Sequence, residues 1–278
     1  MPAPSSPPPA LYNAAAAMEF FRFGGKPKSF ARGEKIFGEN QKPIPFLLMP
    51  QRMYLLLDGE VGILLNNRPI GTVRQGEVFG EMASINQGPR SATAVAKTPC
   101  RVIALDDKQL QAALGKKPEF ALMLMGVMIA RLRENIGRGG PGRAPAGGAK
   151  WRQSVPLPKS LLSDLERVLG SEARTSYESG QSIVKEGQTG VLMYVVLYGR
   201  VAISVGGKLV EKLGQGGVFG EMALIDRAPR LASVVAETAC TLLAIDRHGF
   251  LNLVKKSRRF AASLLTAVSE RARYMTSR

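Results

Sequence analysis

The sequence is poor in the side chains that carry most enzyme chemistry. Its 278 residues hold one histidine, His248, and two cysteines, Cys100 and Cys240. No serine, cysteine or metal-ligand motif accompanies His248, and a solitary histidine is far more often structural than catalytic. The cysteines lie 140 residues apart, which is also the spacing of a sequence repeat, so we expect them in equivalent places of two domains without a disulfide between them. These scarcities predict a protein that is not an enzyme and has no metal site and no cofactor.

Long apolar runs and targeting signals are missing as well. The longest apolar run, residues 120–130, is too short to cross a bilayer. The first ten residues, MPAPSSPPPA, have neither the basic group nor the apolar stretch of a signal peptide. Together with the scarcity of cysteine, this predicts a cytoplasmic protein with no membrane span.

What the sequence does have is a repeat. A 19-residue run, VFGEMASINQGPRSATAVA, returns 140 residues later as VFGEMALIDRAPRLASVVA. Nine positions separate Glu81 from Arg90 in the first copy and Glu221 from Arg230 in the second. A carboxylate and a guanidinium beside a turn of free backbone N–H groups can hold a sugar phosphate from two sides, because glutamate accepts from a ribose hydroxyl and arginine pairs with phosphate. The repeat therefore predicts two phosphate-binding turns.

A blander interpretation stays open. A glutamate and an arginine nine positions apart are, when alone, more often a surface ion pair on a turn. The second copy weighs against this, because the glycine, the small residues and the proline before the arginine all recur. Duplication also fits two purely structural barrels, so degenerate barrels acting as a protein-interaction module are an alternative.

These residues resemble the phosphate-binding cassette of the cyclic nucleotide-binding domain family, which is found in catabolite activator proteins and in protein kinase A regulatory subunits. The resemblance implies cyclic AMP or cyclic GMP as ligand. We call residues 79–93 the first cassette and residues 219–233 the second cassette. The binding residues implied in the first are Phe79, Gly80, Glu81, Met82, Ala83, Arg90, Ser91, Ala92 and Thr93. Those implied in the second are Phe219, Gly220, Glu221, Met222, Ala223, Arg230, Leu231, Ala232 and Ser233.

The resemblance also implies a lid and a base preference. In this family the final helix closes over the base, so the lid candidates are Arg131, Asn135, Arg271, Tyr274 and Thr276, with Tyr274 able to stack on a purine. A hydroxyl directly after the arginine can bridge the phosphate and the amino group of guanine. Because the first cassette has a serine there and the second a leucine, we expect the first pocket to tolerate cyclic GMP and the second to favour cyclic AMP.

Short apolar segments separated by turn residues recur through both halves of the chain, which is typical of an antiparallel barrel or jelly roll. We therefore expect a mainly β fold with flanking helices (α+β), made of two jelly-roll β-barrels in tandem. The expected boundaries are a disordered tail at 1–17, a first domain at 18–136, a flexible basic linker at 137–150 and a second domain at 151–278.

Helices are expected after each barrel. Asp106 and Asp246 are typical of helix N-caps, and the residues that follow each of them have a helical period, with the first such helix expected at residues 119–136. A further helix, residues 159–169, is expected to open the second domain before its barrel. The first of these helices is rich in methionine and is compatible with either a core position or a homodimer seam. A seven-residue insertion within residues 41–52, where the repeat offset changes from 147 to 140, has no assigned role.

Positive charge is concentrated in two stretches. The net charge is +16, and residues 131–152 hold six basic side chains against Glu134 while residues 255–278 hold seven against Glu270. Solvated helix faces explain this best, and a basic regulator that binds nucleic acid without sequence preference is an alternative. No helix-turn-helix follows either barrel, so we expect no sequence-specific DNA binding.

The tandem arrangement also resembles a kinase regulatory subunit. The segment RRFA at residues 258–261 looks like a pseudosubstrate, yet it lies at the head of the expected last helix rather than before the first barrel. The sequence therefore favours a cyclic nucleotide sensor that signals by ligand-driven rearrangement of its C-terminal helices onto an unidentified protein partner.

Overall fold

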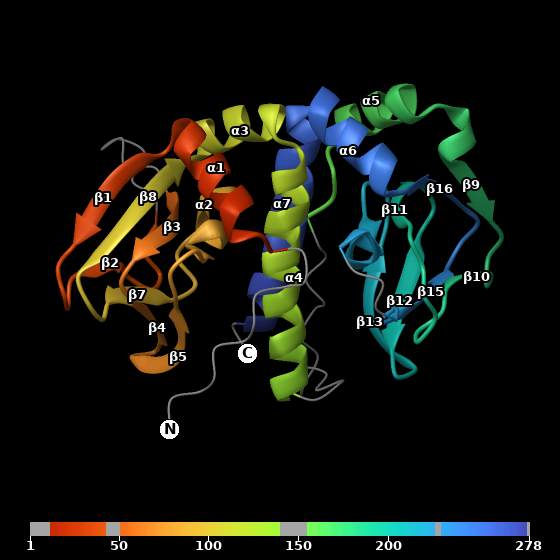
Figure 1. Cartoon of the computed structure of the whole chain (residues 1–278). Coiled ribbons are helices and arrows are strands. Elements are labelled where there is room, and N and C mark those ends of the chain that lie inside the picture. The colour runs from red at the N-terminus through yellow and green to blue at the C-terminus, as the bar shows by residue number, and fades with distance from the viewer. Residues whose placement is uncertain (1–11, 43–50, 140–154, 226–228, 277–278) are drawn as a thin grey trace. The chain divides into compact units, whose positions relative to one another are not determined.

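The computed structural model describes residues 12–42, 51–139, 155–225 and 229–276, and within these it describes only the backbone at 130–139, 258 and 271–276 (Figure 1). The chain divides into two compact units, with the boundary between Met128 and Ile129. Each unit is built from two four-stranded sheets in which every paired strand is antiparallel.

In the first unit the strand orders are β1-β8-β3-β6 and β2-β7-β4-β5. The strands are β1 (Lys26–Phe30), β2 (Lys35–Phe37), β3 (Arg52–Asp58), β4 (Val61–Leu65), β5 (Arg68–Val73), β6 (Val78–Phe79), β7 (Thr93–Ala96) and β8 (Cys100–Asp106). Both sheets contribute to one apolar core, with Tyr54, Leu56 and Val102 from the first sheet and Val61 and Ala94 from the second. Strand β3 buries both of its faces, which explains why its sequence is apolar at every central position rather than alternating.

The helices of the first unit are α1 (Ala14–Gly24), α2 (Glu81–Asn86), α3 (Asp107–Lys116) and the beginning of α4 (Glu119–Gly139), which runs past the boundary after Met128. Helix α1 lies against α3 (Figure 1), and its Phe20 ring stacks on Phe120 with ring centroids 3.4 Å apart. The tail predicted over 1–17 is too long, because residues 14–17 form the first turn of α1 and Ala17 is fully buried. Asn13 caps this turn by accepting from the backbone N–H groups of Ala15 and Ala16, and alanine is the best helix former.

The second unit repeats the plan, with strand orders β14-β11-β16-β9 and β10-β15-β12-β13. Its strands are β9 (Arg174–Tyr177), β10 (Ser182–Val184), β11 (Met193–Tyr198), β12 (Val201–Val205), β13 (Lys208–Leu213), β14 (Val218–Phe219), β15 (Ser233–Ala236) and β16 (Cys240–Ile245). Its helices are α5 (Lys159–Leu169), the 3₁₀ turns η2 (Ser171–Ala173) and η3 (Glu221–Leu224), α6 (Arg247–Lys256) and α7 (Arg258–Thr276). The predicted fold class is confirmed, although each domain is a pair of open sheets rather than a closed barrel.

Several local predictions are confirmed. Helix α5 has the predicted bounds, Asp106 and Asp246 are the N-caps of α3 and α6, and the two cysteines are free and buried. Phe260 is fully buried in the first turn of α7, as expected of a helical rather than a pseudosubstrate segment.

Other predictions meet the edges of the described chain. Helix α4 continues to Gly139 and so takes three residues from the linker predicted at 137–150. The rest of that linker and most of the insertion, residues 43–50, lie outside the described residues. Within the described part, no helix is both long and apolar enough to cross a membrane, and no cluster of side chains could hold a metal ion.

The N-cap of α3 gives a test of the fold. Asp106 accepts from the backbone N–H of Gln109 at 2.9 Å, and the Gln109 side chain accepts from the backbone N–H of Asp106 at 2.9 Å. Because Asp106→Ala removes one half of this capping box, we expect it to lower the free energy of unfolding by about 1 kcal/mol. Urea denaturation measures the change. Lys108→Ala, at an exposed position of the same helix, is the control, and an equal effect of both substitutions would contradict the capping role.

Candidate functional site

The second residue of each cassette is a glycine whose backbone conformation favours glycine. Gly80 has φ 72° and Gly220 has φ 75°, both in the left-handed region. Gly80 follows β6 and is the N-cap of the short helix α2, whereas Gly220 follows β14 and is the N-cap of the 3₁₀ turn η3. A Cβ atom at Gly80 would lie 2.9 Å from Nη1 of Arg90. The turn therefore brings the backbone and the guanidinium into direct contact.

Arg90 is a buried cation held on three sides. Its Nη1 donates to the Gly80 carbonyl at 2.8 Å and its Nη2 donates to the Arg52 carbonyl at 2.8 Å. The guanidinium carbon lies 4.1 Å from the centre of the Phe37 ring, and Arg90 is 3% exposed. Its Nε is also buried, and no described residue accepts a hydrogen bond from it. The guanidinium of Arg90 thus has a donor, Nε–H, that can still form a hydrogen bond.

The surroundings of Arg90 change its electrostatics. Burial lowers the pKa of Arg90 to about 10, and nearby Tyr54 and Glu81 oppose the shift. Arg90 is still charged at neutral pH, because that pKa lies well above 7. Glu81 is fully buried, so its carboxylate acts on Arg90 without a screen of bulk water.

The second cassette repeats these hydrogen bonds with a more open cover. Arg230 donates from Nη1 to the Gly220 carbonyl at 3.1 Å and from Nη2 to the Leu192 carbonyl at 2.8 Å. It lies over Gly190, where a Cβ atom would be 2.4 Å from Nη2. Arg230 is half-buried, and burial lowers its pKa while Tyr194 and Glu221 oppose this.

The other predicted binding residues differ in how deeply they are buried. Met82 and Ala83 are buried in α2, whereas Met222 and Ala223 are half-buried in η3. Phe79 and Phe219 belong to the core, Ala232 packs against it, and Ala92 is half-buried. Ser91 is half-buried and Leu231 is 40% exposed.

The last residue of each cassette ties it to the turn that follows a neighbouring strand, β2 in the first domain and β10 in the second. The Thr93 hydroxyl accepts from the backbone N–H of Glu39 at 2.9 Å, and the Ser233 hydroxyl accepts from that of Glu186 at 3.0 Å. The structure therefore brings glycine, glutamate and arginine together in each cassette, with the hydroxyl at its edge. All five lid candidates lie in α4 or α7, but their side chains are outside the described part of the structure.

Sequence reasoning missed the residues that surround the arginine from other strands. Phe37 ends β2 and the Arg52 and Leu192 carbonyls come from the region of β3 and β11. A carbonyl leaves no mark in a sequence, because every residue has one. Phe37 ends the segment 30–37, which returns 147 residues later at 177–184, yet its counterpart there is Val184, so the repeat itself gives no signal.

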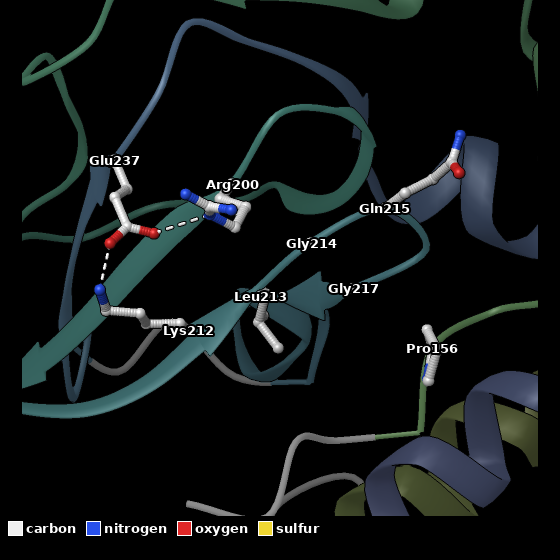
Figure 2. A pocket seen from close by; sticks show the side chains of 8 residues that line it. All are labelled: Pro156, Arg200, Lys212, Leu213, Gly214, Gln215, Gly217 and Glu237. Carbon is white, nitrogen blue, oxygen red and sulfur yellow. Dashed lines mark hydrogen bonds and ion pairs between the residues drawn. The ribbon is translucent and has the colours of Figure 1, made fainter.

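A separate cavity of about 470 Å³ lies in the second unit, away from the cassette residues. Figure 2 shows the Glu237 carboxylate between Arg200, whose Nε is 3.0 Å away, and Lys212. The equivalent pair in the first unit, Glu60 and Lys97, has the opposite polarity and a separation of 2.9 Å. An ion pair of either polarity serves at this place, which indicates a structural contact. The cavity is lined by Pro156, Arg200, Lys212, Leu213, Gly214, Gln215, Gly217 and Glu237.

Fold and site together define a tandem double-sheet protein in which each domain holds an arginine against a glycine turn. The family model for the cyclic nucleotide-binding domain matches residues 27–117 and 174–257. The chain therefore belongs to the cyclic nucleotide-binding domain family and contains two copies of the domain.

The curated relatives agree with this family. The chain is 31% identical over 203 residues to a cAMP-dependent protein kinase regulatory subunit of Eremothecium gossypii, covering 72% of this chain and 39% of the relative. It is 27% identical over 235 residues to a cGMP-dependent protein kinase of Toxoplasma gondii, covering 84% of this chain and 20% of the relative. The regulatory domain of Toxoplasma gondii PKA, solved with cAMP, is 20% identical with a TM-score of 0.32, covering 87% of this chain and 86% of that one. The chain thus spans less than half the length of these two curated relatives.

The contact between Gly80 and Arg90 can be tested by adding one methyl group. Gly80→Ala introduces left-handed strain and also drives a Cβ atom to 2.9 Å from the Arg90 Nη1. Gly33→Ala is the matched control, because Gly33 has φ 83° and no atom of the described residues lies within 4 Å of its added Cβ. We expect the control to lower the free energy of unfolding by about 1 kcal/mol and Gly80→Ala by about 3 kcal/mol. Equal losses in thermal or urea unfolding would show that the arginine does not depend on the bare glycine.

Proposed function

We propose that both domains bind a purine 3′,5′-cyclic nucleotide. The observation that carries this is the buried guanidinium of Arg90, whose Nε has no acceptor among the described residues. A buried charged donor calls for an anion, and a phosphate oxygen in the plane of the guanidinium would supply one. Glu81, fully buried in the same turn, is the group that would accept from a ribose hydroxyl.

We further propose that the chain is a sensor rather than an enzyme. The curated relatives include a kinase regulatory subunit. A regulatory protein needs a contact with its partner that differs between the ligand-free and the ligand-bound state. The output would be a rearrangement of the final helices of each domain, α4 and α7, onto a protein partner, with the lid candidates in those helices closing over the base. In this proposal the protein is cytoplasmic, the first domain ends within α4 and the second begins before α5.

Removing each arginine tests the binding sites one at a time in the full chain. Arg90→Leu should abolish cyclic AMP binding at the first cassette and Arg230→Leu at the second, each costing about 3 to 5 kcal/mol, because a buried phosphate would lose its paired charge. Calorimetry should count two sites in the unsubstituted chain, one in each variant and none in the double variant. The proposal fails if the double variant still binds cyclic AMP normally.

Linear nucleotides provide the ligand control. The terminal phosphate of AMP or the chain of ATP adds charge that a single arginine in a closed turn does not match, so both should bind much more weakly than cyclic AMP. Equal affinities would favour the alternative of a general anion-binding surface. Absence of any nucleotide binding would favour the structural module.

Base preference is tested at the residue after each arginine. Guanine has an amino group that a serine hydroxyl can bind and a leucine cannot, and a buried donor without a partner costs about 1 to 3 kcal/mol. In full chains with the other site silenced, the ratio of cyclic AMP to cyclic GMP affinity should be higher at the second cassette. Ser91→Leu should raise the ratio at the first cassette and Leu231→Ser should lower it at the second. Ratios that do not respond to the exchange would assign the preference elsewhere.

A further inference from the structure

The two cassettes differ in what covers the arginine. In the first domain the Phe37 ring lies under the Arg90 guanidinium and continues into a stack of rings, with centroids 6.0 Å from Tyr54 and 6.1 Å from Phe79. In the second domain Tyr194 and Phe219 keep the last step of this stack, with centroids 5.1 Å apart. The ring that would touch the arginine is replaced by a valine.

Phe37 and Val184 occupy the same place in the fold. Phe37 ends β2 and pairs with Ala94, and Val184 ends β10 and pairs with Val234, the residue 140 positions after Ala94. Both side chains are buried in their core clusters. At this position of the fold the two sites therefore differ by the presence of the ring, since the backbone position and the place of its strand partner are equivalent.

We propose that Phe37 is a positioning residue that makes the first cassette the tighter of the two for an anionic ligand, and this rests on the proposed function. The aromatic face attracts the cation and keeps water from one side of it. The two hydrogen bonds to carbonyl groups restrict movement of the guanidinium within its own plane. The Phe37 ring restricts its movement perpendicular to that plane. A cation that is dry and immobile before the ligand arrives binds an anion with less loss of hydration and of freedom.

The exposure of the two arginines agrees with this. Arg90 is 3% exposed, whereas Arg230 is half-buried over the bare backbone of Gly190. Water can reach the second guanidinium, so its attraction for a phosphate is screened more strongly. Both arginines donate to carbonyls at equivalent positions, so the pattern of hydrogen bonds does not explain a difference between the sites.

The test exchanges the two side chains in the full chain and reads cyclic AMP binding by calorimetry. With the second site silenced by Arg230→Leu, we expect Phe37→Val to weaken binding at the first cassette about tenfold. With the first site silenced by Arg90→Leu, Val184→Phe should tighten binding at the second. Phe30→Val is the packing control, because Phe30 packs against the same core with its ring edge-on to Tyr54. Phe37→Leu, which preserves more volume, replaces Phe37→Val if the latter does not fold.

Two readouts separate positioning from mere packing. Binding of adenosine, which lacks the phosphate, should fall no more in Phe37→Val than in Phe30→Val. If Phe37→Val weakens cyclic AMP and adenosine equally, or weakens cyclic AMP no more than Phe30→Val does, Phe37 does not act through Arg90 and the inference is wrong while cyclic nucleotide binding stands. If the unsubstituted chain binds no cyclic AMP, the proposed function and the inference both fall.

Discussion

The arrangement of the groups around the cassette arginine depends on one constraint, which is that a positive charge is removed from water. An isolated cation removed from water is strongly unfavourable unless polar groups replace its hydration. For Arg90 that replacement comes from the Gly80 carbonyl, the Arg52 carbonyl and the face of Phe37, which belong to segments far apart in the sequence. These groups meet only when both sheets are assembled. A charged centre of this kind therefore forms together with the fold and not before it.

Comparison of the two domains shows which parts of this arrangement tolerate sequence change. The acceptor of Nη2 is the carbonyl of Arg52 in one domain and of Leu192 in the other, so the side chain at that position has no bearing on the bond. Carbonyl acceptors depend on chain geometry and survive substitution. The aromatic ring against the arginine depends on one side chain, and it is absent from the second domain, where Val184 takes the place of Phe37. The two domains can thus share one pattern of hydrogen bonds to the arginine and still differ in the solvent exposure of its side chain.

The same distinction explains how much could be predicted from the sequence. Signals that lie within a few residues of one another were sufficient for the caps at Asp106 and Asp246, for the bounds of α5 and for the glycine turns. Helix α1 was missed because its alanines follow a proline-rich stretch, and its stability depends on burying Phe20 against Phe120, which lies 100 residues away. Phe37 was missed for a similar reason, since its contact with Arg90 crosses from one strand to a distant turn.

Hydrogen bonds hold each cassette near both of its ends. At the C-terminal end, the side-chain hydroxyl of Thr93 or Ser233 accepts from the backbone N–H of a glutamate, Glu39 or Glu186. The carboxylate of that glutamate in turn accepts a backbone N–H at 2.8 Å, from Asn66 in the first domain and from Gly206 in the second. Both copies keep this double link, although threonine is exchanged for serine. The segment between the fixed ends does change, from the α-helix α2 in the first domain to the 3₁₀ turn η3 in the second. Because the two conformations join the same anchors, the short helix is the part of the cassette whose winding the fold leaves to the local sequence.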